Sequence, residues 1–219
     1  RLAGHDYKFI PYARPGLPLA RAIAQRLTPG TNVLILGNHG LVVAAETVTE
    51  AGELLSEICG LLAAPARSSL ASNIVELQKL ASGSDYRLPL DPRAHGAATD
   101  TVSCGVAAGG SLYPDHIVFL GQGSHIAASG ETAASVGAKA LDAGEPKPAS
   151  ILFPGIGVLM RGDASPGADA MAGCLADVTA RVGPGAKLRY LSKAEHGELL
   201  NWDAEKYRQD LNKSGGCAT

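Results

Sequence analysis

The chain has 219 residues, of which 46% are hydrophobic and 18% are charged, and its formal net charge is −2. No uninterrupted apolar run approaches the roughly 18 residues that a membrane-spanning helix needs, which excludes an integral membrane protein. The near-neutral charge argues against binding to nucleic acid or to anionic lipid. The four cysteines contain no C-x-x-C pair, which excludes a dense disulfide framework and favours a reducing cytoplasm. They are Cys59, Cys104, Cys174 and Cys217.

The first third of the chain alternates helical and strand signals. An extended stretch ends in a Pro-Gly turn, and apolar residues at helical spacing then predict a short amphipathic helix over Leu17–Leu27. The apolar run Asn32–Leu36 predicts a central strand that is covered on both faces. Four turn-forming residues separate it from the second apolar run, Leu41–Ala45, so the two runs predict a hairpin or a sharp bend.

A longer helix follows this pair of strands. Thr47 and Glu50, three residues apart, form a capping-box pattern, which opens a helix that continues to about Ala64. Pro65 then closes the helix.

Beyond residue 65 the hydrophobic signal weakens and then resumes. A helix is expected at Asn73–Leu80, and Thr99–Ala108 is too rich in glycine and alanine to assign. We expect domains at 1–68 and 112–213, joined by a connecting region at 69–111. The later expected elements are a strand at His116–Leu120, a helix at Glu131–Ala143, paired strands within Ser150–Met160, a helix at Pro166–Val182, a strand at Lys187–Leu191 and a helix at Lys193–Leu211.

His39 is the strongest candidate for chemistry. Gly37 and Gly40 let the backbone turn tightly at the end of a buried strand, and this leaves His39 where ligands bind in α/β sheets. A neutral imidazole there is able to ligate zinc, although a catalytic zinc site needs about three protein ligands. The alternative is a turn histidine whose ring bonds to a backbone carbonyl, and spacing alone favours that interpretation.

These motifs carry a family resemblance. The segments YARPG (12–16) and VLILGNHGL (33–41), with the capped helix from Thr47, resemble the C-terminal half of the class II aldolase/adducin domain. LYPDHIV (112–118) and LLNWD (199–203) are similar to its long branch, which includes the aldolase part of bifunctional rhamnulose-phosphate aldolase/dehydrogenases. The resemblance implies an α/β fold, with half of a three-layer α/β/α aldolase-like domain and a smaller α/β domain.

The resemblance also implies a site and an activity. His39 matches one of three zinc-binding histidines in the family, so the resemblance favours a metal role for it. The family's H-x-H motif and its acid/base glutamate precede the matching segment, so we expect both upstream of Arg1, within about another half-domain. The implied protein is a metal-dependent aldolase-type lyase that uses Zn²⁺ or another divalent metal on a phosphorylated sugar or related hydroxy-carbonyl compound, as a homo-oligomer such as a tetramer.

Two further residues are candidates for substrate binding. The guanidinium of Arg14 suits a phosphate or a carboxylate, although a surface arginine before a Pro-Gly turn is commoner. Asn38 would orient His39 or contact the substrate, but asparagine also tolerates left-handed backbone geometry, and we favour that structural role. The alternative functions are a non-catalytic adducin-like interaction module, and a sugar-acid decarboxylase or epimerase on the same fold.

Overall fold

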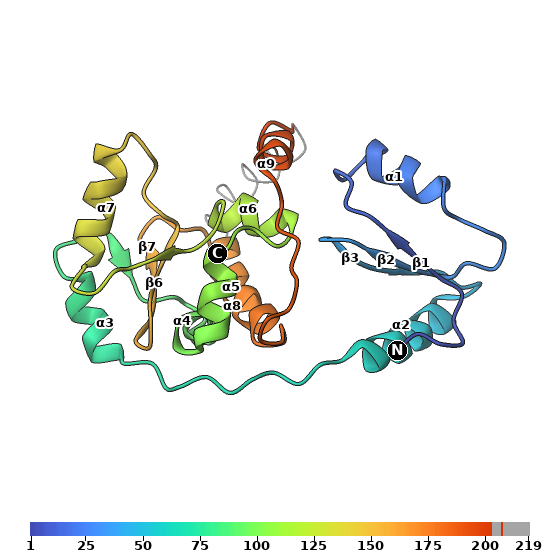
Figure 1. The fold of residues 1–219 in the computed structure, drawn as a ribbon, viewed down its shortest axis with the longest axis horizontal. Coiled ribbons are helices and arrows are strands. Elements are labelled where there is room, and N and C mark those ends of the chain that lie inside the picture. The colour runs from blue at the N-terminus through green and yellow to red at the C-terminus, as the bar shows by residue number, and fades with distance from the viewer. Residues whose placement is uncertain (203–206, 208–219) are drawn as a thin grey trace, which may run out of the picture. The chain divides into compact units, whose positions relative to one another are not determined.

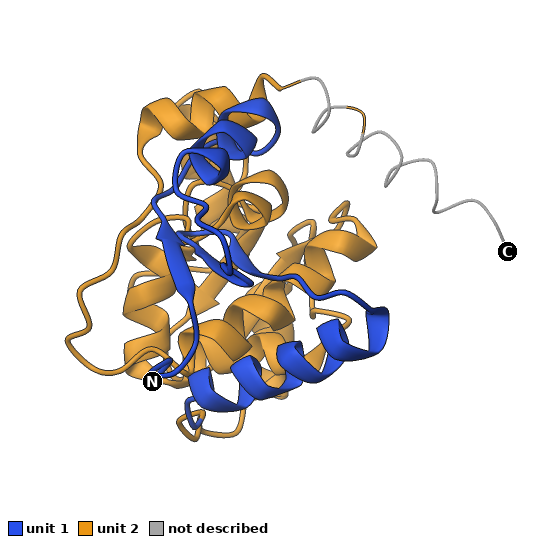
Figure 2. Ribbon diagram, turned by 90° about the vertical axis from the view of Figure 1, so that its right-hand side faces the viewer, with its two compact units in different colours: residues 1–65 blue, residues 66–219 orange. Residues whose placement is uncertain are grey.

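The computed structural model describes residues 1–202 and Tyr207. The chain divides into two compact units, residues 1–65 and residues 66 onward (Figure 2). Both units mix helices with a small sheet, so the α/β class is confirmed. No helix within the described part of the chain has the length and apolar character needed to cross a lipid bilayer.

The first unit is built on a three-stranded sheet (Figure 1). Strand β2 (Val33–Leu36) lies in the centre, parallel to β1 (Tyr7–Ile10) and antiparallel to β3 (Gly40–Val43). The expected central strand and its hairpin are therefore confirmed. Strand β1 was not predicted from the sequence, and its side chains Tyr7 and Phe9 stay exposed.

One helix packs on each face of this sheet. Alternate residues of a strand point to opposite faces, and the buried clusters follow this alternation. Helix α1 (Leu17–Ala24) packs on the face that carries Leu34 and Leu36. Helix α2 (Val48–Leu62) packs through Leu54 and Ile58 on the other face. The complete three-layer class II aldolase arrangement stays a prediction, because the unit has only three strands.

Helix α2 begins with the expected capping box. The backbone N–H of Glu50 donates to Thr47 Oγ1 over 3.2 Å, and the N–H of Thr47 donates to Glu50 Oε2 over 3.0 Å. These two bonds satisfy donors that a helix start otherwise leaves unpaired. The helix ends at Leu62, before Pro65.

The second unit contains a four-stranded sheet in the order β4-β7-β6-β5. Strands β6 (Ser150–Phe153) and β7 (Gly157–Arg161) form the expected antiparallel hairpin. The edges are short: β4 (Tyr86–Arg87) pairs with β7, and β5 (His125–Ile126) runs parallel to β6.

Helices cover both faces of the second sheet. Residues from α3 (Ile74–Ala81) and α7 (Ala133–Asp142) pack with Ile151 and Leu159 on one face. The opposite face packs against an alanine-rich layer, where small side chains let the helices approach closely. This layer comprises the 3₁₀ turn η1 (Pro92–His95) and the helices α4 (Gly96–Thr99), α5 (Thr101–Ala108), α6 (Pro114–Leu120) and α8 (Pro166–Thr179).

The segment 69–111 differs from its expected role as a connecting region. It supplies α3, η1, α4 and α5, which lie in the second compact unit, and the chain divides at residue 65. Arg67 connects the first residues of the second unit to the rest of it. Its guanidinium donates to Asp100 Oδ2 over 2.6 Å and to the carbonyl of Thr179 over 2.9 Å. The alanines and glycines that obscured the hydrophobic pattern are the residues that allow tight helix packing.

The expected strand at His116–Leu120 is wrong, because these residues lie in helix α6. Pro114 occupies the first turn of the helix, where its missing N–H costs nothing, and Asp115 follows in the same turn. Gly121, with φ of 90°, ends the helix. The β-branched run HIVFL favoured a strand, but the proline before it and packing against α8 decide the outcome.

The expected strand at Lys187–Leu191 is also wrong. These residues are irregular, and Leu191 donates one backbone hydrogen bond, over 2.9 Å, to the carbonyl of Ser111. Helix α9 (Lys193–Leu200) agrees with the start of the helix expected at Lys193–Leu211. Apart from Tyr207, the rest of that expected helix, beyond Trp202, lies outside the described residues.

Candidate functional site

The turn between β2 and β3 holds the predicted metal ligand. The N–H of His39 donates to the carbonyl of Leu36 over 3.0 Å, which closes a tight turn. Asn38 has φ of 55°, in the left-handed region that asparagine tolerates better than most residues. The conformation of Asn38 is thus a sufficient reason for an asparagine at this position.

Gly37 brings this turn against the segment that follows β1. Its N–H donates to the carbonyl of Ile10 over 2.8 Å. A Cβ at Gly37 would lie 3.1 Å from both the backbone nitrogen of Tyr12 and the ring of Phe9. These distances leave little room for a side chain, so glycine permits the close approach of the two loops.

The three predicted site residues follow two neighbouring strand ends. Strands β1 and β2 are parallel, so their carboxyl ends meet at one edge of the sheet, where α/β folds bind ligands. Arg14 lies in the loop after β1, and Asn38 and His39 lie in the turn after β2. Arg14 and Asn38 are half-buried, whereas His39 is exposed. The fold therefore places the candidate residues in adjacent loops with His39 open to solvent.

The described residues do not complete a metal site. No group of three or more His, Cys, Asp or Glu side chains that suits a metal ion occurs among residues 1–202 and 207. The other histidine of the first unit, His5, lies 3.4 Å from Glu57 on α2. Within the described part of the chain, His39 is therefore a single prospective ligand that needs partners to hold a metal.

A small cavity of about 260 Å³ lies in the second unit, between α7 and the turn before β4. The ion pair of Lys147 with Asp85, 2.9 Å apart, lies at this cavity, and the hydrogen bond from Lys147 lowers the pKa of that carboxyl. The cavity is smaller than the roughly 300–1,000 Å³ typical of ligand pockets. It contains none of the predicted site residues.

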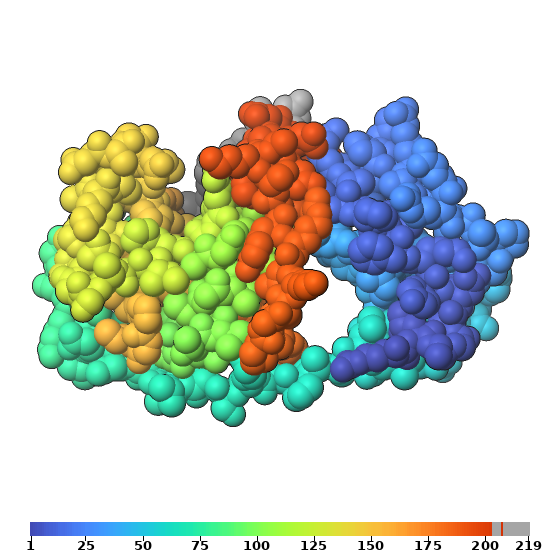
Figure 3. Space-filling model, in the orientation of Figure 1, coloured from blue at the N-terminus to red at the C-terminus, as the bar shows by residue number. Residues whose placement is uncertain are grey.

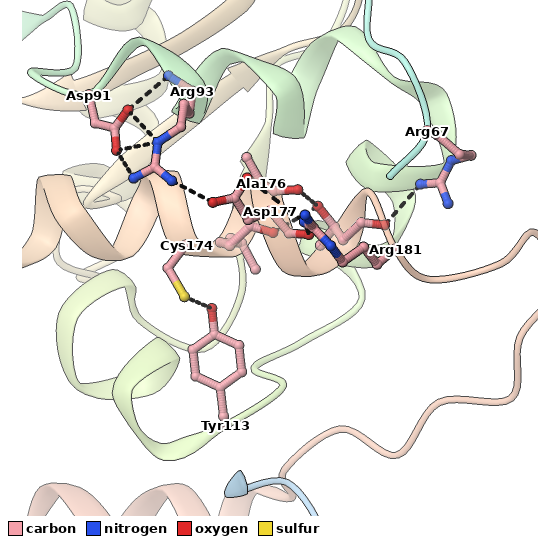
Figure 4. A network of polar contacts seen from close by, with 10 residues as sticks. Arg67, Asp91, Arg93, Tyr113, Cys174, Ala176, Asp177 and Arg181 are labelled. Atoms are coloured by element: carbon pink, nitrogen blue, oxygen red, sulfur yellow. Dashed lines mark hydrogen bonds and ion pairs between the residues drawn. The ribbon is translucent and has the colours of Figure 1, made fainter. Parts of the chain in front are cut away.

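A polar network ties η1 to α8 (Figure 4). The guanidinium of Arg93 lies 2.6 Å from the carboxylates of both Asp91 and Asp177. Nearby, the hydroxyl of Tyr113 lies 4.0 Å from Cys174 Sγ. Because these polar groups pair with one another, we interpret the network as structural.

The second unit contains a buried cluster of two histidines and a serine that was not predicted from the sequence. His196 Nε2 lies 2.6 Å from Ser111 Oγ, although the two residues are 85 positions apart. His116 is completely buried, and its Nδ1 accepts a hydrogen bond from the N–H of Leu112 over 3.2 Å. No spacing motif connects these residues, so only the folded structure reveals them.

Comparison with known proteins bears on the first unit. Residues 1–62 match the family model of the class II aldolase and adducin N-terminal domain. This match supports the family that the sequence motifs suggested, over less than a third of the chain. No curated protein matches the chain, and no solved structure matches it. The looser resemblance of residues 112–211 to the long branch of the family stays a prediction.

Proposed function

We propose that the first unit is part of a class II aldolase-type lyase that acts on a phosphorylated sugar or a related hydroxy-carbonyl compound. The observation that carries the proposal is the placement of Arg14 and the Asn38–His39 turn at one sheet edge, within the segment that matches the family. A homo-oligomer fits this proposal, since Val48 and Leu55 expose apolar surface on α2.

His39 has the central role in this proposal. Its exposed imidazole would be one ligand of a divalent metal such as zinc, and the other ligands and the acid/base would come from outside the described residues. A divalent metal supplies Lewis-acid activation of the substrate's oxygens when it is bound. Arg14 would hold the phosphate, because a guanidinium pairs with two phosphate oxygens at once. Asn38 would set the turn that directs His39 outward.

Substrate profiling of the protein expressed from its complete gene tests the proposal. A panel of ketose phosphates and sugar acids is incubated with wild type and with His39→Ala, and the released aldehydes and carbon dioxide are measured. His5→Ala is the matched control, because His5 lies in the same unit but pairs with Glu57. We expect wild type and His5→Ala to cleave a ketose phosphate and His39→Ala to lose that activity.

The other outcomes separate the rival functions. If the protein releases carbon dioxide from a sugar acid or epimerises it, and cleaves no sugar phosphate, the function is that of a decarboxylase or epimerase and not of an aldolase. Absence of metal and of turnover in wild type would favour the non-catalytic adducin-like module. Full activity of His39→Ala would contradict the metal role of His39.

A further inference from the structure

The loop after helix α5 is held by the chain that leads from α8 to α9, drawn in orange-red in Figure 1 and lying against the green surface of the α5–α6 region in Figure 3. The ring of Tyr190 lies on Gly109 and Gly110: a Cβ at Gly109 would come within 2.5 Å of the Tyr190 hydroxyl. That hydroxyl donates to the carbonyl of Val106 over 3.2 Å. Neither glycine leaves room for a side chain, so the two segments are matched in shape.

Ser111 receives two contacts from the same stretch of chain. The N–H of Leu191 donates to its carbonyl, and His196 Nε2 lies 2.6 Å from its hydroxyl. Ser192 begins α9 with a capping box, so His196 is carried on a defined helix. His196 therefore connects α9 directly to the loop before α6.

His116, on α6, is the second histidine of this cluster. Its Nδ1 accepts the hydrogen bond from Leu112, so in the neutral ring the proton is assigned to Nε2. Among the described residues, His116 Nε2 and His196 Nδ1 have no hydrogen-bond partner. Within that part of the chain, no carboxylate bonds to these two nitrogens to stabilise a positive charge.

We propose that His116 and His196 form an acid-sensitive latch, which holds helix α9 against α6 while both rings are neutral and releases it when they take up protons. A second proton on His116 would occupy Nδ1 and face the N–H of Leu112, which removes the hydrogen bond between them. Two charged imidazoles would also repel each other inside a buried cluster.

The charged and titratable groups near His116 and His196 do not cancel the destabilising effect of protonating the two rings. Helix α9 carries Glu195, which raises the pKa of His196, but burial lowers that pKa more strongly. Glu195 is itself engaged by Arg189, 2.5 Å away. The remaining neighbours are Asp115 and Tyr113 on the α6 side, Glu198 and Lys193 on α9, and Cys174 on α8, which lies next to Tyr113.

The direction of the response follows from the two protonation states. Burial, helped by His196, lowers the pKa of His116 to about 4, compared with about 6.5 for an unperturbed histidine. Between about pH 4 and pH 6.5 the released state therefore binds more protons than the closed state, so a falling pH favours release. The latch is fully closed above about pH 6.5 and weakens as the pH falls toward 4.

A catalytic interpretation of the Ser111–His196 pair does not fit. The serine side chain is completely buried, so a substrate has no path to its hydroxyl. A nucleophile has to reach the reacting atom, whereas a latch needs only to hold two elements together.

Trp202 offers a direct probe, because it is the only tryptophan in the sequence and it follows α9. Its fluorescence is recorded from pH 7 to pH 4, alongside far-ultraviolet circular dichroism. We expect a reversible shift of the emission to longer wavelength with a midpoint below 6.5, before any loss of secondary structure. An emission maximum that does not move over this range in wild type would overturn the proposal.

Two variants assign the response to the latch. In His116→Asn/His196→Gln, the amides keep hydrogen-bonding groups but do not titrate, so the shift should disappear. The control is His125→Gln on β5, which should respond like wild type. A shift that persists in the double variant would also overturn the proposal. If the double variant does not fold, the single variants His116→Asn and His196→Gln take its place, and a shift that is unchanged in both would overturn the proposal.

Discussion

The Asp91–Arg93 ion pair of η1 packs against α8 at Gly173. Replacing Gly173 by alanine tests this contact between η1 and α8. A Cβ at Gly173 would lie 2.8 Å from Asp91 Cγ and would overlap one carboxylate oxygen. The same carboxylate caps η1, since its Oδ1 accepts the N–H of Arg93 over 3.0 Å. Gly173→Ala must therefore move Asp91 or α8.

The expected cost combines three effects. Overpacking a tight contact costs about 1–3 kcal/mol, and loss of a cap costs about 0.5–2 kcal/mol. Replacing a helical glycine by alanine returns about 0.5–1 kcal/mol. The displaced cap and the overpacking result partly from the same movement, so their two costs do not add in full. We therefore expect Gly173→Ala to lower the free energy of unfolding by about 1–3 kcal/mol.

Urea denaturation followed by circular dichroism measures this difference. Gly105→Ala is the matched control, because Gly105 is an exposed helical glycine in α5 whose added Cβ would meet no atom within 4 Å. Gly105→Ala should raise the free energy of unfolding by about 0.5–1 kcal/mol through helix propensity alone. Equal stability of the two variants would refute the reasoning, because the docking contact would then cost nothing.

Three further predictions concern single side chains. Asn38→Ala should be less stable than Asn38→Gly by about 1 kcal/mol in thermal unfolding, because residue 38 has a φ of 55°, which glycine adopts without the strain that alanine meets. Arg87→Ala should cost about 3–5 kcal/mol in urea denaturation, since it leaves the carboxylate of Asp169, which is 2% exposed, without its ion-pair partner. The hydrogen bond from Arg67 lowers the pKa of Asp100 to about 2, so this carboxylate stabilises the fold above about pH 4 and loses that effect as the pH falls toward 2. Asp100→Asn should therefore lose about 2 kcal/mol at neutral pH and show a weaker acid dependence of stability.

Local signals predicted the first unit well. The capping box of Thr47 and Glu50 depends on residues three positions apart, and the hairpin depends on four consecutive residues. Strand β1 was missed because its pairing with β2 joins residues 26 positions apart, such as Tyr7 and Val33. In the second unit, HIVFL was misassigned because the β-branched pattern outweighed the helix-starting signal of Pro114.

The candidate site was only partly predictable. His39 and its turn were found because the strand and the N-H-G motif are contiguous. The cluster of Ser111, His116 and His196 was not found, because packing of distant segments brings His196 against Ser111, 85 positions away. Long-range pairing of this kind leaves no periodic pattern in a single sequence.

The zinc content of the protein expressed from its complete gene tests the central claim, that His39 is a metal ligand, most directly. Elemental analysis and calorimetric titration are applied to wild type and to His39→Ala, with circular dichroism to show that both are folded. Loss of one of about three ligands should abolish tight binding, a larger effect than the roughly 10–100-fold loss when a supporting residue is removed. We expect stoichiometric zinc in wild type and none in His39→Ala. Stoichiometric zinc in folded His39→Ala would contradict the account and leave His39 as a turn residue.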